Sequence, residues 1–221
     1  MPVPLPRVCS VLAHELRSPL SVIQGYIRLL QRQRDADARD TAILQAMLQS
    51  TARLTVIARQ ASDLGTWLTA LDTTPLPTVH LGAVVDALSE RAQDSASVRV
   101  VTSATTAARR LDAAPKALAD AVVALAESMA RETGESVIEI SIADSPADGS
   151  TRFVLRPRPS VAESAAPPTR TNTQRAVTFD RGGAGLALIL ASYVLDAHGA
   201  TVTPDESGHI SLRLPPERGP Q

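Results

Sequence analysis

The sequence has a single cysteine, almost no net charge and no long apolar run, and each of these features excludes a class of protein. Cys9 is the only cysteine, which excludes an internal disulfide and is typical of a reducing compartment. The formal net charge of −1 gives no electrostatic case for nucleic acid or an anionic membrane as a partner. No stretch has the roughly 18 unbroken apolar residues of a membrane span, and Met1 to Pro6 lacks the features of a signal peptide. We therefore expect a cytoplasmic chain that binds neither nucleic acid nor a membrane.

An apolar stripe with helical spacing runs through the N-terminal part of the chain. At about 100° per residue, its six members fall on one arc of a helix that we expect from about Arg7 to Arg34. His14 then points to the opposite, solvent side. Because Pro19 cannot donate to the carbonyl of Glu15, the helix should bend or loosen one turn after His14. The stripe consists of Leu12, Leu16, Leu20, Ile23, Ile27 and Leu30.

Residues 14–20 read His-Glu-Leu-Arg-Ser-Pro-Leu. This segment resembles the H-E-x-R-x-P-L phosphoacceptor box of the two-component histidine kinase family. A zinc protease would need a second ligand at position 18, which is serine. An ordinary surface histidine leaves the mid-helix proline unexplained, although such a proline costs about 3 kcal/mol unless its distortion is used. The resemblance implies that His14 carries a phosphoryl group.

The same segment suggests a role for each polar side chain. Neutral imidazole, with an ordinary pKa of about 6.5, can attack phosphorus through one ring nitrogen. Glu15 can hydrogen-bond the other ring nitrogen, which makes it the orienting group and candidate general base. We therefore predict His14 and Glu15 as the catalytic pair. Arg17, Ser18 and Pro19 are the predicted contacts to the phosphoryl group or partner, although Arg17 is equally explained as a solvated side chain.

A second amphipathic helix follows a polar turn at residues 34–39, with Asp40 as its N-cap. Its apolar residues recur at alternating spacings of four and three, which is a heptad pattern. Two helices cannot bury both stripes against each other alone, so we predict a homodimeric four-helix bundle, which the resemblance also implies. Residues 1–74 form this predicted first domain. The heptad positions are Ile43, Met47, Ser50, Leu54, Ile57, Ala61, Leu64, Leu68 and Leu71.

Residues 75–221 have a different, mixed texture. Helical patterns cover residues 81–91, 115–131 and 185–197, and β-branched or alternating segments cover 98–102, 137–142, 151–155, 200–204 and 209–214. A proline-rich run from Arg156 to about Arg175 is expected to be mobile. The order and lengths of these segments resemble the ATP-binding domain of histidine kinases, a sandwich of helices on a sheet. The predicted fold class is therefore α+β, a helical hairpin followed by a degenerate ATPase-like domain.

The motifs of that second domain depart from the family pattern. The resemblance places a magnesium-binding N-box over residues 123–133, where Ala124 and Ser128 replace its two asparagines. It places the adenine-binding Asp-x-Gly-x-Gly run over residues 155–159, where arginine has no acceptor and proline has no N–H. The alternative stretch, Asp144 to Gly149, precedes a strand and is better explained as a turn.

A glycine-rich helix start survives in part, as Gly183-Ala184-Gly185 with Ala187 at the third glycine position. Such a start can bind phosphate or simply permit a tight turn, and we favour the turn. Ser128, Gly183 and Gly185 are therefore the only weak, degenerate cofactor contacts that we predict. His80, His198 and His209 lack ligand spacing and are assigned to the surface or to packing, so no metal site is predicted.

Three functions remain open from the sequence. The favoured one is a histidine phosphotransfer protein in which His14 exchanges phosphoryl groups with aspartates of response regulator receiver domains. Its magnesium would come from the receiver, there is no intrinsic cofactor, and ATP should bind weakly or not at all. The second is a divergent kinase that phosphorylates His14 with ATP, and the third is a docking scaffold without phosphate chemistry. Whether the chain is an enzyme depends on which of these holds.

Overall fold

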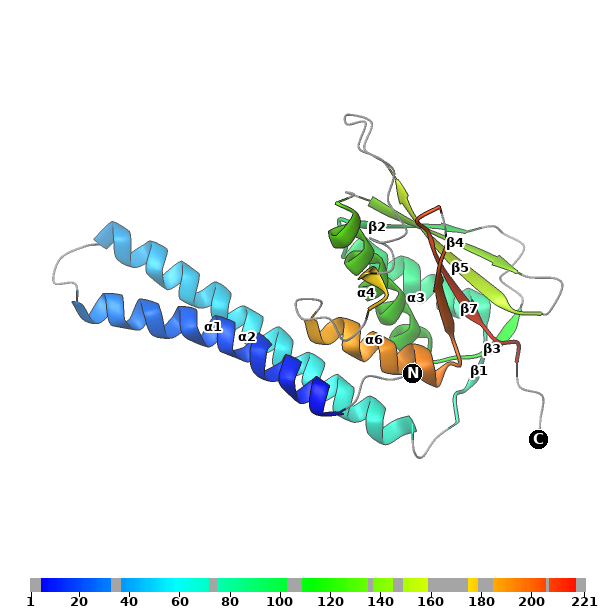
Figure 1. Cartoon of the computed structure of the whole chain (residues 1–221), viewed down its shortest axis with the longest axis horizontal. Coiled ribbons are helices and arrows are strands. Elements are labelled where there is room, and N and C mark those ends of the chain that lie inside the picture. Colours follow the sequence, from blue (N-terminus) through cyan, green and yellow to red (C-terminus); the bar gives the residue numbers. More distant parts are fainter. Residues whose placement is uncertain are drawn as a thin grey trace.

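The computed structural model describes residues 5–32, 37–71, 75–102, 109–134, 137–144, 149–158, 175–178, 185–205 and 207–217. A long helical hairpin comes first, and an α/β sandwich follows it (Figure 1). The last helix of the sandwich lies against one end of the hairpin, so the two parts of the chain are in contact. This arrangement has the order of elements that the sequence predicts.

The hairpin consists of α1 (Leu5–Arg32) and α2 (Asp37–Leu71). Residues 37–39 are helical, so the predicted turn is shorter than expected, and residues 33–36 lie outside the described part. α1 is continuous through Pro19, so the helix does not end at this proline. The Pro19 residue is buried, so its packing offsets part of the cost of the missing backbone donor.

The heptad seam of α2 forms as predicted over the residues whose side chains are described. Ile43, Ser50, Ile57 and Leu64 are buried, at 5 to 7% exposed. The alternate members, at positions 47, 54 and 61, are half-buried, and the side chains of residues 68 and 71 lie outside the described set. The seam therefore faces α1 within the same chain.

The predicted stripe on α1 is displaced around the helix. Leu20 and Ile27 were expected to be buried but are 45% and 41% exposed, whereas Val8 and Val11 are buried. Val8 and Val11 pack against α6, and this long-range contact turns the buried side of α1 away from the stripe predicted by its own periodicity. The displaced side is left without a partner among the described residues.

The sandwich contains a five-stranded sheet of order β2-β4-β5-β7-β6. Its strands are β2 (Val98–Thr102), β4 (Val137–Asp144), β5 (Thr151–Arg158), β6 (Thr201–Pro204) and β7 (Ile210–Leu214). Only the β2–β4 pair is parallel. A separate pair, β1 (Thr78–His80) with β3 (Arg110–Asp112), was not predicted, because three residues are too few to show an alternating pattern.

β5 extends three residues beyond its predicted end, to Arg158. The expectation of a mobile run from Arg156 is therefore wrong for residues 156–158, which pair with β4. Proline is tolerated at position 157 because β7 pairs with β5 only as far as Leu155, which leaves one side of the strand end without a described neighbour. Residues 159–174 lie outside the described part.

Three helices cover one face of this sheet: α3 (Leu81–Gln93), α4 (Pro115–Thr133) and α6 (Gly185–Ala197). α4 begins with Pro115 in its first turn and ends at Gly134, whose φ of 73° is left-handed. One side of α4 is buried against the sheet by residues such as Leu118, Val122 and Leu125. The other side, which carries Ala124 and Glu127, remains available to line a site.

His198 joins the end of α6 to the start of α4. Its Nδ1 is 2.6 Å from the carbonyl of Val194, and its Nε2 accepts the backbone N–H of Ala114 over 3.1 Å. Burial lowers the pKa of His198, in spite of the opposing bond to Val194, so the ring is neutral. This confirms the prediction of a packing histidine.

α6 is apolar on nearly every side because it is covered twice. One side enters the main core, whereas Leu186, Ile189 and Tyr193 pack against the hairpin. On the hairpin these three contact a cluster formed by Val8, Val11 and Leu64. α6 thereby holds the sandwich beside the N-terminal half of α1, where His14 lies.

Candidate functional site

His14 is exposed on α1, about two and a half turns from its start, as the helical periodicity predicts. Arg17 and Ser18 are also exposed, Glu15 is half-buried and Pro19 is buried. Among the described residues, no hydrogen bond joins His14 to Glu15, because the two side chains leave the helix in different directions. The phosphoacceptor box therefore presents its histidine to solvent and its glutamate toward the sandwich.

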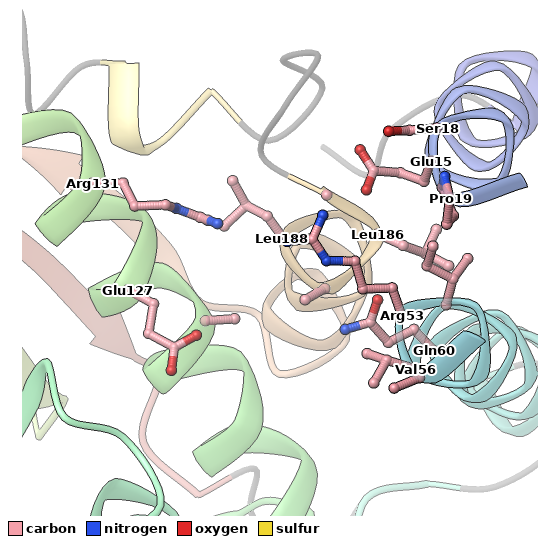
Figure 2. Close-up of a pocket in the computed structure, with 15 residues that line it drawn as sticks. Glu15, Ser18, Pro19, Arg53, Val56, Gln60, Glu127, Arg131, Leu186 and Leu188 are labelled. Carbon is pink, nitrogen blue, oxygen red and sulfur yellow. The ribbon is translucent and has the colours of Figure 1, made fainter. Parts of the chain in front are cut away.

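A cavity of about 510 Å³ lies between the hairpin and the sandwich (Figure 2). Its walls come from α1, α2, α4 and the first turn of α6. Its size is within the usual range for small-ligand pockets. The lining residues are Glu15, Ser18, Pro19, Ala52, Arg53, Val56, Ile57, Gln60, Ala124, Glu127, Arg131, Gly185, Leu186, Ala187 and Leu188.

The cavity has charges of both signs on its walls. Figure 2 shows Arg53 reaching from α2 toward α6, and Arg131 reaching from α4 toward α6 from the other side. Glu15 enters from α1, whereas Glu127 on α4 accepts a hydrogen bond from the Ser95 hydroxyl over 2.9 Å. Two guanidinium groups are thus available to pair with an anion, beside the turn that carries His14.

The predicted site residues are only partly brought together. Glu15, Ser18, Pro19 and Gly185 line the cavity, and His14 and Arg17 do not. Gly183 lies outside the described residues. Ser128 does not line the cavity either: it is buried, and its hydroxyl donates to the carbonyl of Ala176 over 3.3 Å.

The stretch that the family resemblance aligns with the adenine-binding motif lies elsewhere. Leu155, at the aspartate position, is fully buried in the core. Arg156 and Arg158 are exposed on the sheet face opposite the helices, and Arg158 forms an ion pair with Glu139 over 3.3 Å. Strand alternation directs these two arginines away from the cavity beside Glu15.

Sequence reasoning missed four polar residues of the cavity: Arg53, Gln60, Glu127 and Arg131. Glu127 and Arg131 share the face of α4 that carries Ala124, so helical spacing from the N-box position could have found them. Arg53 and Gln60 are seven residues apart on α2 and therefore also share a face. Their approach to α4 depends on the docking of α6, which no local pattern encodes.

The described residues contain no group of three or more histidine, cysteine, aspartate or glutamate side chains placed to hold a metal ion. Among the described helices, none is long and apolar enough to cross a membrane.

The comparisons with known proteins agree with this architecture. Residues 7–66 match the family model of the His Kinase A (phospho-acceptor) domain, a family whose members in general dimerise and interact with response regulators. Among solved structures, the chain is similar to the histidine kinase AdeS of Acinetobacter baumannii, with a TM-score of 0.59 and 14% identity over 93% of this chain and 98% of that one.

A second similar structure is full-length ShkA, determined in complex with AMPPNP, with a TM-score of 0.56 and 16% identity over 99% of this chain and 47% of that one. No curated protein sequence matches the chain. Residues 7–66 therefore match a histidine kinase phosphoacceptor domain, and the chain as a whole has the fold of histidine kinases.

Proposed function

We propose that this chain is a histidine phosphotransfer protein, in which His14 exchanges phosphoryl groups with aspartates of response regulator receiver domains. The main support for this proposal is the difference between the two domains of the chain. The phosphoacceptor histidine is exposed in an intact box, whereas the positions that would hold a nucleotide are filled or engaged.

The residues present do not fit ATP with magnesium. Ala124 offers no polar atom, and the Ser128 hydroxyl is buried and already donates to the carbonyl of Ala176. Leu155 places an apolar side chain in the core where an acceptor for the adenine amino group is needed. No step of the proposed mechanism therefore passes through ATP, and the phosphoryl group comes from the partner.

In the proposed transfer, a neutral ring nitrogen of His14 attacks the phosphorus of an aspartyl phosphate. The P–N bond forms as the P–O bond to the aspartate breaks, and the carboxylate leaves with the electron pair. The imidazole ring becomes positively charged, and the Glu15 carboxylate, once it turns toward the ring, stabilises that charge. The receiver's acidic pocket supplies the magnesium ion, since the described residues around His14 form no carboxylate cluster.

We infer that the working form is a homodimer. Seven large apolar side chains of the hairpin are 40 to 70% exposed in the single chain, and such a set is costly to leave in water. A second hairpin packed against part of this exposed apolar surface would complete a four-helix bundle. The seven, which lie on more than one side of the hairpin, are Leu20, Val22, Ile27, Leu29, Leu44, Leu48 and Val56.

One observation favours a second candidate, a divergent kinase. The cavity beside Glu15 is large enough for a small ligand, and Arg53 and Arg131 lie on its walls. If ATP bound there in a different pose, His14 could be phosphorylated by the chain itself. The docking scaffold is the remaining alternative.

Two parallel incubations of the purified chain separate these candidates, one with γ-labelled ATP and magnesium, the other with a labelled phosphoreceiver. The phosphotransfer proposal expects label only from the receiver, and calorimetry should give no micromolar dissociation constant for ATP with magnesium. Label from ATP would establish the kinase instead. If neither source gives label, the docking scaffold would be the remaining candidate function.

A further inference from the structure

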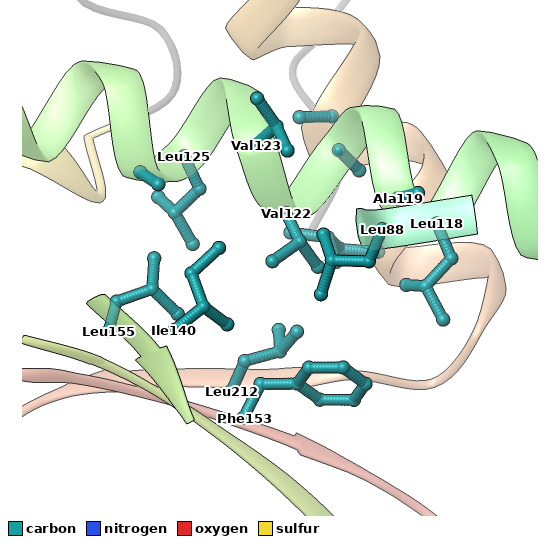
Figure 3. Packing of buried hydrophobic residues seen from close by; sticks show 14 of the residues in the cluster. Leu88, Leu118, Ala119, Val122, Val123, Leu125, Ile140, Phe153, Leu155 and Leu212 are labelled. Atoms are coloured by element: carbon teal, nitrogen blue, oxygen red, sulfur yellow. The ribbon is translucent and has the colours of Figure 1, made fainter. Parts of the chain in front are cut away.

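The outer face of the five-stranded sheet carries five arginines and a single carboxylate. The helices cover the opposite face: Figure 3 shows Ile140, Phe153, Leu155 and Leu212 of the sheet on the side of α4. Because side chains alternate along a strand, the intervening residues point outward. The charged outward residues that the structure describes are Arg99, Glu139, Arg152, Arg156, Arg158 and Arg213.

Strand register arranges four of these arginines in two rows. In the first row, Arg99 lies beside Glu139 and Glu139 beside Arg156, across β2, β4 and β5. In the second row, Arg152 of β5 lies directly beside Arg213 of β7. Arg152 and Arg156 are four residues apart on one strand, so the rows are separated by about 13 Å.

A row of small and apolar side chains lies between them. It runs across all five strands, and its members are successive partners in the sheet. Val101 is 43% exposed, so this row offers apolar surface to a partner. The members of this row are Val101, Ser141, Val154, Ser211 and Thr203.

The charge of this face is poorly compensated within the chain. Glu139 pairs with Arg158, and Arg213 donates to the Ser150 hydroxyl over 2.8 Å. Arg99, Arg152 and Arg156 pair with no carboxylate among the residues that the structure describes. Placing Arg152 directly beside Arg213 is itself unfavourable, because like charges opposite each other destabilise a sheet.

We propose that this outer face is a docking site for an acidic amphipathic helix of a partner protein. A helix with its side chains is about 10 to 12 Å wide, which matches the space between the two arginine rows. Five strands about 4.8 Å apart span about 19 Å, the length of roughly 13 helical residues. Carboxylates on both flanks of the helix pair with Arg152 and Arg156, and its apolar stripe covers Val101 and Val154.

Other anionic partners fit this face less well. Its described outward residues include no aromatic ring for stacking on bases, and a flat sheet inserts nothing into a groove of a duplex. The apolar side chains among its described outward residues are small, with Val101 and Val154 as the largest, so no aromatic ring or leucine can enter a lipid interface. A planar guanidinium forms two parallel bonds to one carboxylate, so arginine rows favour carboxylates that are held in place by a helix.

The test measures fluorescence anisotropy of the full chain with a labelled peptide of about 14 residues, in which glutamates flank a leucine and alanine stripe. A peptide with glutamine in place of each glutamate is the control. The proposal expects a dissociation constant below about 100 µM at low salt, weakening with added salt, and at least about tenfold weaker binding for the glutamine peptide.

Two double variants locate the binding. Arg152→Glu with Arg156→Glu should weaken it at least about tenfold, whereas Arg91→Glu with Lys116→Glu, the same charge change on the covered side of the sheet, should leave it within about twofold. Arg152→Lys with Arg156→Lys keeps the charge and should give an intermediate loss. Circular dichroism of each variant should match the parent, because the substituted side chains are exposed or partly exposed.

Equal binding of the two peptides, or no effect of the Arg152 and Arg156 variant, overturns the proposal. Tighter binding of a labelled DNA duplex or of phosphatidylserine vesicles, lost in the same variant, would assign the face to phosphates instead. Self-association of the chain that this variant abolishes would make the occupant a second copy. None of these results depends on phosphotransfer by His14, so this proposal and the proposed function can fail separately.

Discussion

At the residue scale, two histidine side chains differ in their burial and hydrogen bonding. His198 is buried between α4 and α6 with both ring nitrogens engaged, whereas His14 is exposed on α1. The first is fixed in its neutral form by burial, and the second is free to meet an incoming partner. Spacing to other possible metal ligands does not distinguish the two histidines, since neither has any. Only the phosphoacceptor motif around His14 identified it as a functional residue.

Changing His198 to Gln should reduce the dependence of stability on pH. The pKa of His198 is lowered in the folded chain, so the unfolded chain binds a proton below about pH 6.5 that the folded chain does not. This contribution to stability is complete above that pH and is lost as the pH falls, by up to about 1.4 kcal/mol per pH unit. Gln can still accept the bond from Ala114 but does not titrate.

The measurement is thermal unfolding at about pH 7.5 and about pH 5.5. The melting temperature should fall more in the parent than in the His198→Gln variant on going to the lower pH. An equal fall in both proteins would show that His198 does not couple folding to protonation.

Changing Glu15 to Gln should slow phosphoryl transfer at least about tenfold while leaving receiver binding unchanged. The amide keeps the shape and can orient a ring nitrogen, but it lacks the charge that stabilises the imidazolium. The control is Glu127→Gln, the same change on the opposite wall of the cavity, which should not affect transfer. Equal slowing by both variants would assign the effect to the cavity as a whole and not to Glu15.

At the element scale, the long periodic segments were predictable and the contacts between distant elements were not. The limits of α6 and β2 agree with the prediction, because each is bounded by a clear change of pattern. The buried side of α1 was misplaced because Val8 and Val11 pack on α6, which is more than 170 residues away in the sequence. For the same reason Arg53 and Arg131 were not predicted to share a cavity.

The exposed side of the hairpin leads to a prediction about assembly. Leu44 and Leu48 are 52% and 70% exposed in the single chain, so a charge at these positions should not unfold the hairpin. In a dimer the same charge would be buried without a partner. Leu44→Asp with Leu48→Asp should therefore convert the dimer to single chains at micromolar concentration, as measured by light scattering.

The control for assembly is Gln49→Asp, which adds a charge at the neighbouring exposed position without removing an apolar side chain. It should remain dimeric. A parent protein that scatters as one chain at this concentration would contradict the four-helix bundle directly.

At the scale of the whole molecule, the chain has the fold of a histidine kinase. α6 packs on both the hairpin and the core, and it brings the sandwich beside the turn of α1 that follows His14. The family fold was predictable because the motif and the order of elements were both present in the sequence. The burial of the residues that the resemblance aligns with the nucleotide motifs was not predictable. It depends on the directions of the side chains of Leu155, Arg156 and Ser128.

The most direct test of the proposed function is transfer of label from a phosphorylated receiver domain to the parent chain and to its His14→Ala variant. His14 is exposed and contributes little to packing, so the variant should keep the fold and the dimer. If His14 is the phosphoacceptor, the parent should carry acid-labile, alkali-stable label and the variant should carry none. Equal labelling of the variant, or failure of every receiver from the host to donate to the parent, would contradict it.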